Sequence, residues 1–137
     1  MPQAVLLDMT AVTDYLAGDQ GAGALVEKAL SGEIAASVST MTVLQLWRSR
    51  VDDRRAEIRL IALLKFVDQV PVNAEVARVA GQMCSRSRQA SRAVDGPRAD
   101  EEVMVAVNVA VSRELSVPVC TRDARTYQGH GCEVVPY

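Results

Sequence analysis

Aromatic residues are scarce in this sequence of 137 residues, which has one Phe, one Trp and three Tyr. So few rings nearly exclude the stacked aromatic platforms that many single-strand nucleic-acid binders use. Val, Ala, Leu and Ile must therefore fill the core, as they commonly do between a parallel sheet and its helices. The length and the hydrophobic content of 49% suit one core, so we expect a single domain over residues 1–137.

Cysteine and long apolar runs are also sparse. Cys84, Cys120 and Cys132 are odd in number and widely spaced without a CxxC pair, which argues against a disulfide framework and a zinc site. No stretch approaches the roughly 18 apolar residues of a membrane span, and the first residues lack the basic segment of a signal peptide. We expect a soluble, cytoplasmic protein that makes no contact with a membrane.

An excess of positive charge is absent too, since the formal net charge is -2. Thirteen of the fifteen basic residues are nevertheless Arg, whose forked side chain suits phosphate oxygens. They form two groups in the sequence: Arg48, Arg50, Arg54, Arg55 and Arg59, and then Arg86, Arg88, Arg92 and Arg98. Local basic patches can hold nucleic acid on a neutral protein, although an Arg on a helix is more often only solvated.

Short apolar runs alternate with helical patterns, which predicts an α/β fold with a mainly parallel central sheet flanked by helices. Strands are expected at residues 4–7, 34–39, 69–72, 117–120 and 133–135. Helices are expected at residues 10–16, 24–30, from a cap at Thr40 or Thr42 through Trp47, around 60–67, and from a cap at Asn73 through Cys84. Residues 48–55 and 85–98 are expected to be polar connections.

Residues 101–115 fit both a strand and a helix. Their valines alternate strictly, as in a strand. However, the stretch is longer than a typical strand of about 5–6 residues, and the acidic opening Asp100-Glu101-Glu102 suits a helix N-terminus. We therefore predict a helix.

Acidic residues follow two of the predicted strands. Asp8 closes the first strand, and Asp123 follows the fourth. In an open α/β sheet, ligands collect outside the carboxyl ends of the strands, and the helix that begins near Asp100 directs Glu101 and Glu102 toward the same region. Carboxylates held close together need a hard cation, which predicts a Mg²⁺ or Mn²⁺ site. For Asp8 or Asp123 taken singly, the alternative is a helix cap.

Other catalytic arrangements have less support. The one histidine, His130, lies in a Gly-rich turn, and no nucleophile elbow accompanies it, so a catalytic triad is not indicated. Cys120 lies within an apolar strand and is expected to be an inert core thiol. The sequence contains no GxGxxG or Walker pattern for a nucleotide cofactor.

Three segments together resemble a PIN domain, specifically the VapC toxins of bacterial toxin-antitoxin pairs. They are LLDMTAVTDYLAGD at residues 6–19, STMTVLQLWRSR at residues 39–50 and VPVCTRDARTY at residues 117–127. The resemblance spans nearly the whole chain in order and spacing. It implies a PIN-like three-layer fold, a Mg²⁺- or Mn²⁺-dependent endoribonuclease that cuts RNA, a cognate antitoxin that occupies or blocks the site, and a homodimer.

The resemblance also assigns residues to roles. Asp8 takes the place of the family's first acid, Thr10 that of the following hydroxyl residue, and Asp123 that of the fourth acid, preceded by Thr121. For the third acid, Glu102 aligns best and Asp100 is a close rival. The metal and the catalysis are thus assigned to Asp8, Glu102 or Asp100, and Asp123.

One departure from the family concerns Gln45, which stands where the second motif is expected to have a Glu. A neutral amide weakens metal binding or proton handling relative to a carboxylate. It motivates an alternative hypothesis, a degenerate PIN domain that binds RNA or a protein partner without cutting. A small-molecule metal hydrolase is a third possibility, which the Arg groups disfavour because they suit a long polyanion.

Overall fold

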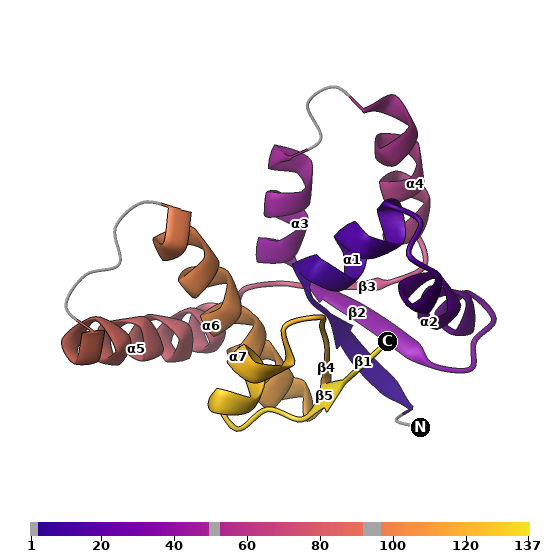
Figure 1. The fold of residues 1–137 in the computed structure, drawn as a ribbon. Helices are drawn as coiled ribbons and strands as arrows, with labels where there is room; N and C mark the ends of the chain where they lie inside the picture. Colours follow the sequence, from indigo (N-terminus) through magenta and orange to yellow (C-terminus); the bar gives the residue numbers. More distant parts are fainter. Residues whose placement is uncertain (1–2, 50–52, 92–96) are drawn as a thin grey trace.

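The computed structural model describes residues 3–49, 53–91 and 97–137 and confirms the predicted alternation of strands and helices (Figure 1). The strands are β1 (Ala4–Leu7), β2 (Ala35–Ser39), β3 (Asp68–Val70), β4 (Val119–Cys120) and β5 (Val134–Val135). The helices are α1 (Met9–Leu16), α2 (Gln20–Leu30), α3 (Thr40–Arg48), α4 (Arg54–Leu64), α5 (Ala74–Ser91), α6 (Pro97–Leu115) and α7 (Ala124–Gly129). Within the described residues, no helix is long and apolar enough to cross a membrane.

All five strands form one parallel sheet in the order β3-β2-β1-β4-β5. The chain builds outward from β1 through β2 to β3, and then crosses to the other side of β1 to add β4 and β5. In the register of the two central strands, Leu6 lies beside Val119 and Leu7 beside Cys120. The strand order therefore reverses between β1 and β4, which is the position where open α/β sheets bind ligands.

Helices cover both faces of the sheet, as expected for three layers (Figure 1). One hydrophobic core joins Leu7 to α1, α2, α3 and α4, whereas the other joins Leu6 to α5, α6 and α7. Leu6 and Leu7 serve different cores because neighbouring side chains of a strand point to opposite faces. Cys120 is fully buried in the first core, and burial raises the pKa of its thiol to about 12. The prediction of an inert core thiol is consistent with this burial.

Side-chain caps set where several helices begin. Five helices follow a residue whose side chain accepts a hydrogen bond from the first turn: Asp8, Asp19, Ser39, Asp53 and Asn73. Helix α3 is capped by Ser39, so the prediction of Thr40 or Thr42 was wrong, and both lie inside the helix instead. Asn73 accepts a hydrogen bond of 2.9 Å from the N–H of Val76, which confirms the predicted cap of α5.

Helix α6 settles the ambiguity of the alternating valines. It contacts both the sheet and α5, so Val107, Val109 and Val111 are all buried although they point in different directions around the helix. A helix that is buried on several sides carries apolar residues all round, and alternation then gives no information about its period. The predicted helix is confirmed, and it begins earlier, at Pro97, where proline suits the first turn.

The polar stretch at residues 85–98 was predicted to be a connection, and this was largely wrong. Helix α5 continues to Ser91, and α6 begins at Pro97. The Ser, Arg and Gln residues of this stretch are compatible with a helix, and the pairing of α5 with α6 supplies stability that the local pattern does not show. The short helix α7 was not predicted, and it follows directly from Asp123.

Candidate functional site

A pocket of about 650 Å³ lies at the carboxyl ends of β1 and β4, where the strand order reverses. Most of the residues assigned from the sequence line it: Asp8, Thr10, Gln45, Asp100 and Asp123. Glu101 and Arg122 are further charged residues of its lining. We call this space the acidic pocket. Its position is the one that the strand-end argument predicts for a ligand site.

Asp8 is the most buried acid of the acidic pocket, with 3% of its surface exposed. Its Oδ1 accepts hydrogen bonds from the backbone N–H of Ala11 at 2.9 Å and from the hydroxyl of Thr10 at 2.7 Å. Burial raises the pKa of Asp8 although these hydrogen bonds favour the charged form. Asp8 therefore caps α1 and also lines the pocket, so its role as a helix cap does not exclude a role as a ligand.

Two threonine hydroxyls connect the ends of β1 and β4. Thr121 Oγ1 donates to Asp8 Oδ2 at 2.6 Å and accepts a hydrogen bond of 2.9 Å from the N–H of Asp123. In the first turn of α1, Thr10 Oγ1 accepts a hydrogen bond of 2.9 Å from the N–H of Arg122. Thr121 is buried behind the pocket and fixes the two acids relative to each other without lining it.

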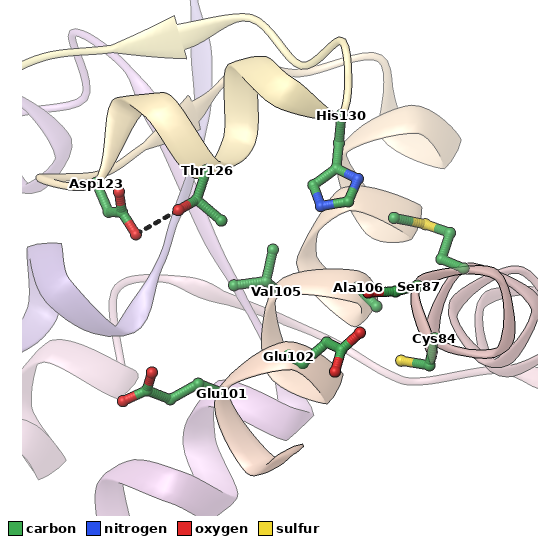
Figure 2. Close-up of a pocket in the computed structure, with 10 residues that line it drawn as sticks. Cys84, Ser87, Glu101, Glu102, Val105, Ala106, Asp123, Thr126 and His130 are labelled. Carbon is green, nitrogen blue, oxygen red and sulfur yellow. Dashed lines mark hydrogen bonds between the residues drawn. The ribbon is translucent and has the colours of Figure 1, made fainter. Parts of the chain in front are cut away.

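Asp123 opens α7 but makes no capping hydrogen bond with its side chain. Its Oδ2 instead accepts a hydrogen bond of 2.7 Å from the hydroxyl of Thr126, one turn further along (Figure 2). The carboxylate of Asp123 thus has fewer partners than that of Asp8. It is held at the wall of the acidic pocket with capacity for a further ligand.

Arg48 connects Gln45 with the start of α6. Its guanidinium donates to Gln45 Oε1 at 3.4 Å and lies 3.5 Å from Asp100 Oδ2, and both charged side chains are exposed. An exposed pair of this kind contributes little to stability. Its effect is to place a positive charge at the rim of the acidic pocket, beside the amide that stands where a carboxylate was expected.

The two glutamates of α6 face different spaces. Glu101 lines both the acidic pocket and a neighbouring pocket, whereas Glu102 lines the neighbouring pocket and not the acidic one, and it turns toward α5 (Figure 2). Consecutive residues of a helix point about 100° apart, so one of the two must turn away. The structure therefore does not bring Glu102 together with Asp8, and Glu101 is a pocket acid that the sequence assignment of the third position missed.

The donor set suits a hard cation in kind. Carboxylate and amide oxygens are the ligands that Mg²⁺ and Mn²⁺ take, and the acidic pocket offers both. Asp8 Oδ2 accepts one hydrogen bond, which leaves it room for a metal bond. Among the described residues, however, no three acidic, His or Cys side chains are close enough together to form a complete metal site. The donor atoms of the acidic pocket therefore fit such an ion in chemical type.

A buried polar network lies behind the acidic pocket and was not found from the sequence. Asn108 Oδ1 accepts a hydrogen bond of 2.8 Å from Ser39, and its amide donates to the hydroxyl of Tyr127 at 3.2 Å. Thr42 lies within hydrogen-bonding distance of Ser39 and Asn108. The network holds together the start of α3, the middle of α6 and the helix α7. Burial raises the pKa of the Tyr127 hydroxyl, so it remains a neutral donor and acceptor.

The predicted Arg groups are only partly available for a ligand. Arg59 donates to the carbonyls of Tyr15 and Leu16 at the end of α1, and it stacks over the Tyr15 ring, so it has a structural role. Arg54, Arg55 and Arg86 are exposed. Arg50 and Arg92 lie outside the described residues, as do the side chains of Arg88 and Arg98. Arg122 lines the acidic pocket and is anchored by Asp14 Oδ1 at 2.6 Å.

Comparison of the whole structure with solved structures gives close matches in fold. VapBC2 from Rickettsia felis, solved with a DNA fragment from its promoter, matches with a TM-score of 0.70 at 9% identity over 97% of this chain and 98% of that chain. FitAcB from Neisseria gonorrhoeae gives 0.65 at 19% identity over 95% of each. VapC20 from Mycobacterium tuberculosis, described as a Sarcin-Ricin loop cleaving toxin, gives 0.62 at 17% identity over 93% and 95%.

No protein-family profile and no curated sequence matches the chain. The structural matches extend over nearly the full length of both chains, so they involve the sheet, both helical layers and the strand reversal. The chain has a VapC-like PIN fold, as the three sequence segments predicted. The fold is established by architecture rather than by sequence identity, which stays below 20% in these matches.

Proposed function

We propose that the chain is a metal-dependent endoribonuclease and the toxin component of a toxin-antitoxin pair. The observation that carries the proposal is that Asp8, Glu101 and Asp123 all line one pocket at the strand reversal of a VapC-like fold. One similar structure is described as a toxin that cleaves the Sarcin-Ricin loop, which is an RNA substrate. As a cytoplasmic protein it would meet RNA directly.

The residues of the acidic pocket suit the hydrolysis of a phosphodiester. Asp8 and Asp123 would hold Mg²⁺ or Mn²⁺, with Glu101 or Asp100 as the third acid. When bound, such an ion activates water and stabilises charge on the phosphate. Arg122 faces the same pocket, and its ion pair with Asp14 fixes the guanidinium where it can bind a phosphate oxygen. The hydroxyls of Thr10 and Thr121 keep the carboxylate of Asp8 in one orientation.

Cleavage of a mixed RNA pool tests the proposal. Purified protein is incubated with Mn²⁺, with EDTA, and as the variants Asp8→Asn and Asp123→Asn. We expect the wild type to cleave with Mn²⁺ and not with EDTA. In each variant the cleavage rate should fall by about 100-fold or more, a size typical of catalytic acid-base groups. Asp68→Asn, an exposed acid on the edge strand β3, is the matched control and is expected to cleave normally. Equal cleavage by Asp8→Asn and the wild type would contradict the assignment.

A degenerate PIN domain that binds without cutting is the second candidate, and Gln45 favours it. In this case the acidic pocket would lack the charge needed to hold a cation. Titration calorimetry with Mn²⁺ separates the two candidates, because a nuclease of this kind must bind the ion at millimolar concentration or below. Absence of binding, together with intact RNA in every reaction, would support the degenerate domain.

We further propose an antitoxin partner that covers exposed apolar side chains on α3 and α4. Leu44 on α3 and Ile58 on α4 are 53% and 56% exposed, and Trp47 and Ile61 lie one turn further along the same helices. Both helices pack against α1, so these side chains belong to one layer of the molecule. Exposed apolar groups of this kind suit the apolar face of a partner helix. One similar structure, from Klebsiella pneumoniae, is described as a toxin-antitoxin complex.

Co-purification tests the partner and the homodimer in one experiment. The chain is co-expressed with the small antitoxin that the proposal predicts to be encoded beside its gene, and the complex is measured by size-exclusion chromatography with light scattering. We expect a stable complex that Ile58→Lys disrupts, whereas the same change at the exposed Gln82 on α5 leaves it intact. The mass of the chain alone reports whether it forms a homodimer.

A further inference from the structure

A second pocket, of about 280 Å³, lies between α5, α6 and α7 (Figure 2). It shares Glu101, Val105 and Asp123 with the acidic pocket, so the two spaces adjoin along one face of α6. The mechanism proposed above uses the acidic pocket and leaves this second pocket without a role. Whatever binds in it lies directly beside the groups that would act on a phosphate.

The walls of the second pocket suit a flat ring with a polar edge. Met83, Val105 and Ala106 provide apolar surface, and the imidazole of His130 points into the space from the end of α7 (Figure 2). Proteins recognise single-stranded RNA by placing unstacked bases against apolar and aromatic side chains, including His, and by hydrogen bonding to the base edges. The position beside the acidic pocket suits a base attached to the sugar next to the bound phosphate.

Glu102 supplies the polar group of the second pocket. Its Oε1 is buried and has no hydrogen-bond partner among the described residues. An unsatisfied buried acceptor is costly, and that cost is removed when a ligand brings a donor. The terminal torsion of a Glu side chain is soft, so a small rotation presents both carboxylate oxygens to the space.

We propose that the second pocket binds a guanine base of the RNA, with Glu102 accepting hydrogen bonds from its N1–H and its 2-amino group. Guanine is the only standard base that presents two neighbouring donors on its Watson-Crick edge. Adenine and cytosine place an acceptor nitrogen beside their amino group, and uracil flanks its N–H with two carbonyl oxygens. These acceptors would face the carboxylate and be repelled. The proposal rests on the proposed ribonuclease function and specifies its substrate.

Binding of short RNA tests the guanine subsite without requiring cleavage. Fluorescence anisotropy is measured for the pentanucleotides UUGUU, UUAUU and UUIUU, where inosine lacks the 2-amino group. Ca²⁺ replaces Mn²⁺ to prevent hydrolysis. We expect UUGUU to bind the wild type about tenfold more tightly than UUAUU, a ratio typical of one bidentate contact to a base. Inosine should lose most of this preference.

The variant Glu102→Gln should bind UUGUU and UUAUU equally, because one carboxylate oxygen becomes an amide donor. Glu27→Gln, an exposed residue on α2, should keep the full preference. Two results would overturn the guanine subsite: equal binding of UUGUU and UUAUU by the wild type, or an unchanged preference for UUGUU in Glu102→Gln. Both results would leave the ribonuclease proposal standing. Should that variant not fold, the inosine comparison on the wild type decides alone. Loss of cleavage, tested separately with Asp8→Asn, bears only on the ribonuclease proposal.

Discussion

Thr121 Oγ1 donates a hydrogen bond of 2.6 Å to Asp8 Oδ2, although 113 positions of the sequence separate the two residues. The bond is buried, and the same hydroxyl accepts from the N–H of Asp123. It therefore connects the first strand of the sheet to the residue that closes the acidic pocket on the other side. Thr121 thus contacts both acids directly and contributes to their arrangement.

Replacement of this hydroxyl should weaken both the fold and the site. Thr121→Val keeps the shape of the side chain but leaves a buried carboxylate oxygen and a backbone N–H without their partner. We expect the free energy of unfolding to fall by about 1–3 kcal/mol, as measured by urea denaturation. Thr121→Ser retains the hydroxyl and should lose less than half as much. Equal losses in the two variants would show that the methyl group, not the hydrogen bonds, matters here.

The raised pKa of Asp8 predicts how stability changes with pH in the absence of metal. The folded protein holds the proton of this carboxyl more tightly than the unfolded chain does. Its contribution is therefore present at low pH and is lost as the pH rises from the ordinary carboxyl range, about 4, through the raised value. Asp8→Asn should remove this loss. In EDTA at neutral pH we expect the variant to melt at a higher temperature than the wild type.

The control for this effect is Asp68→Asn, which should leave the pH dependence unchanged because Asp68 is exposed on an edge strand. Addition of Mn²⁺ should raise the melting temperature of the wild type more than that of Asp8→Asn. A wild-type protein that is destabilised by acid and unaffected by Asp8→Asn would show that another carboxyl dominates.

Restoring the expected carboxylate at position 45 should strengthen metal binding. In Gln45→Glu the new charge faces the acidic pocket beside Arg48, which can balance it in the absence of metal. We expect the affinity for Mn²⁺ to rise about tenfold by calorimetry, the lower end of the effect of groups that surround a metal. Gln82→Glu adds the same charge on α5 and should have no effect. An unchanged affinity in Gln45→Glu would place the cation away from α3.

Asn108 should be more important for stability than its polarity suggests. Asn108→Ala removes partners from Ser39 and Tyr127, both of which are buried. We expect a loss of about 2–3 kcal/mol in the free energy of unfolding. Asn73→Ala, which removes the cap of α5 and an exposed hydrogen bond to Glu114, should cost about 1 kcal/mol. Equal losses in the two variants would mean that solvent or neighbouring groups replace the buried partners.

The sequence predicted the features that depend on strand ends. Asp8 and Asp123 could be placed in one pocket because both follow apolar runs, and parallel strands bring their carboxyl ends to one edge of the sheet. The alternating valines of α6 by themselves suggested a strand, whereas the length of the segment and its acidic first residues correctly predicted a helix. These arguments use only local pattern and the geometry of a parallel sheet.

The features that the sequence did not predict depend on how helices are rotated and paired. Whether Glu101 or Glu102 faces the acidic pocket depends on the rotation of α6, which is set by its packing between the sheet and α5. Val105 lies one helical turn after Glu101, and both line the acidic pocket. This spacing could have identified Glu101 from the sequence, but only if the start of the helix had been known. The partners of Asn108 come from distant segments, and no local pattern records them.

The reversal of strand order also determines when the acidic pocket can first exist. The pocket lies at the ends of β1 and β4, which are neighbours in the sheet but are the first and fourth strands in chain order. Asp8 is therefore synthesised long before its partners Thr121 and Asp123. During synthesis on a ribosome, the chain would fold its first three strands and most of its helices before the pocket closes. A partly synthesised chain therefore carries Asp8 at the end of β1 without Thr121 and Asp123, and the site cannot act on any nucleic acid near it until both residues have been made and β4 has paired with β1.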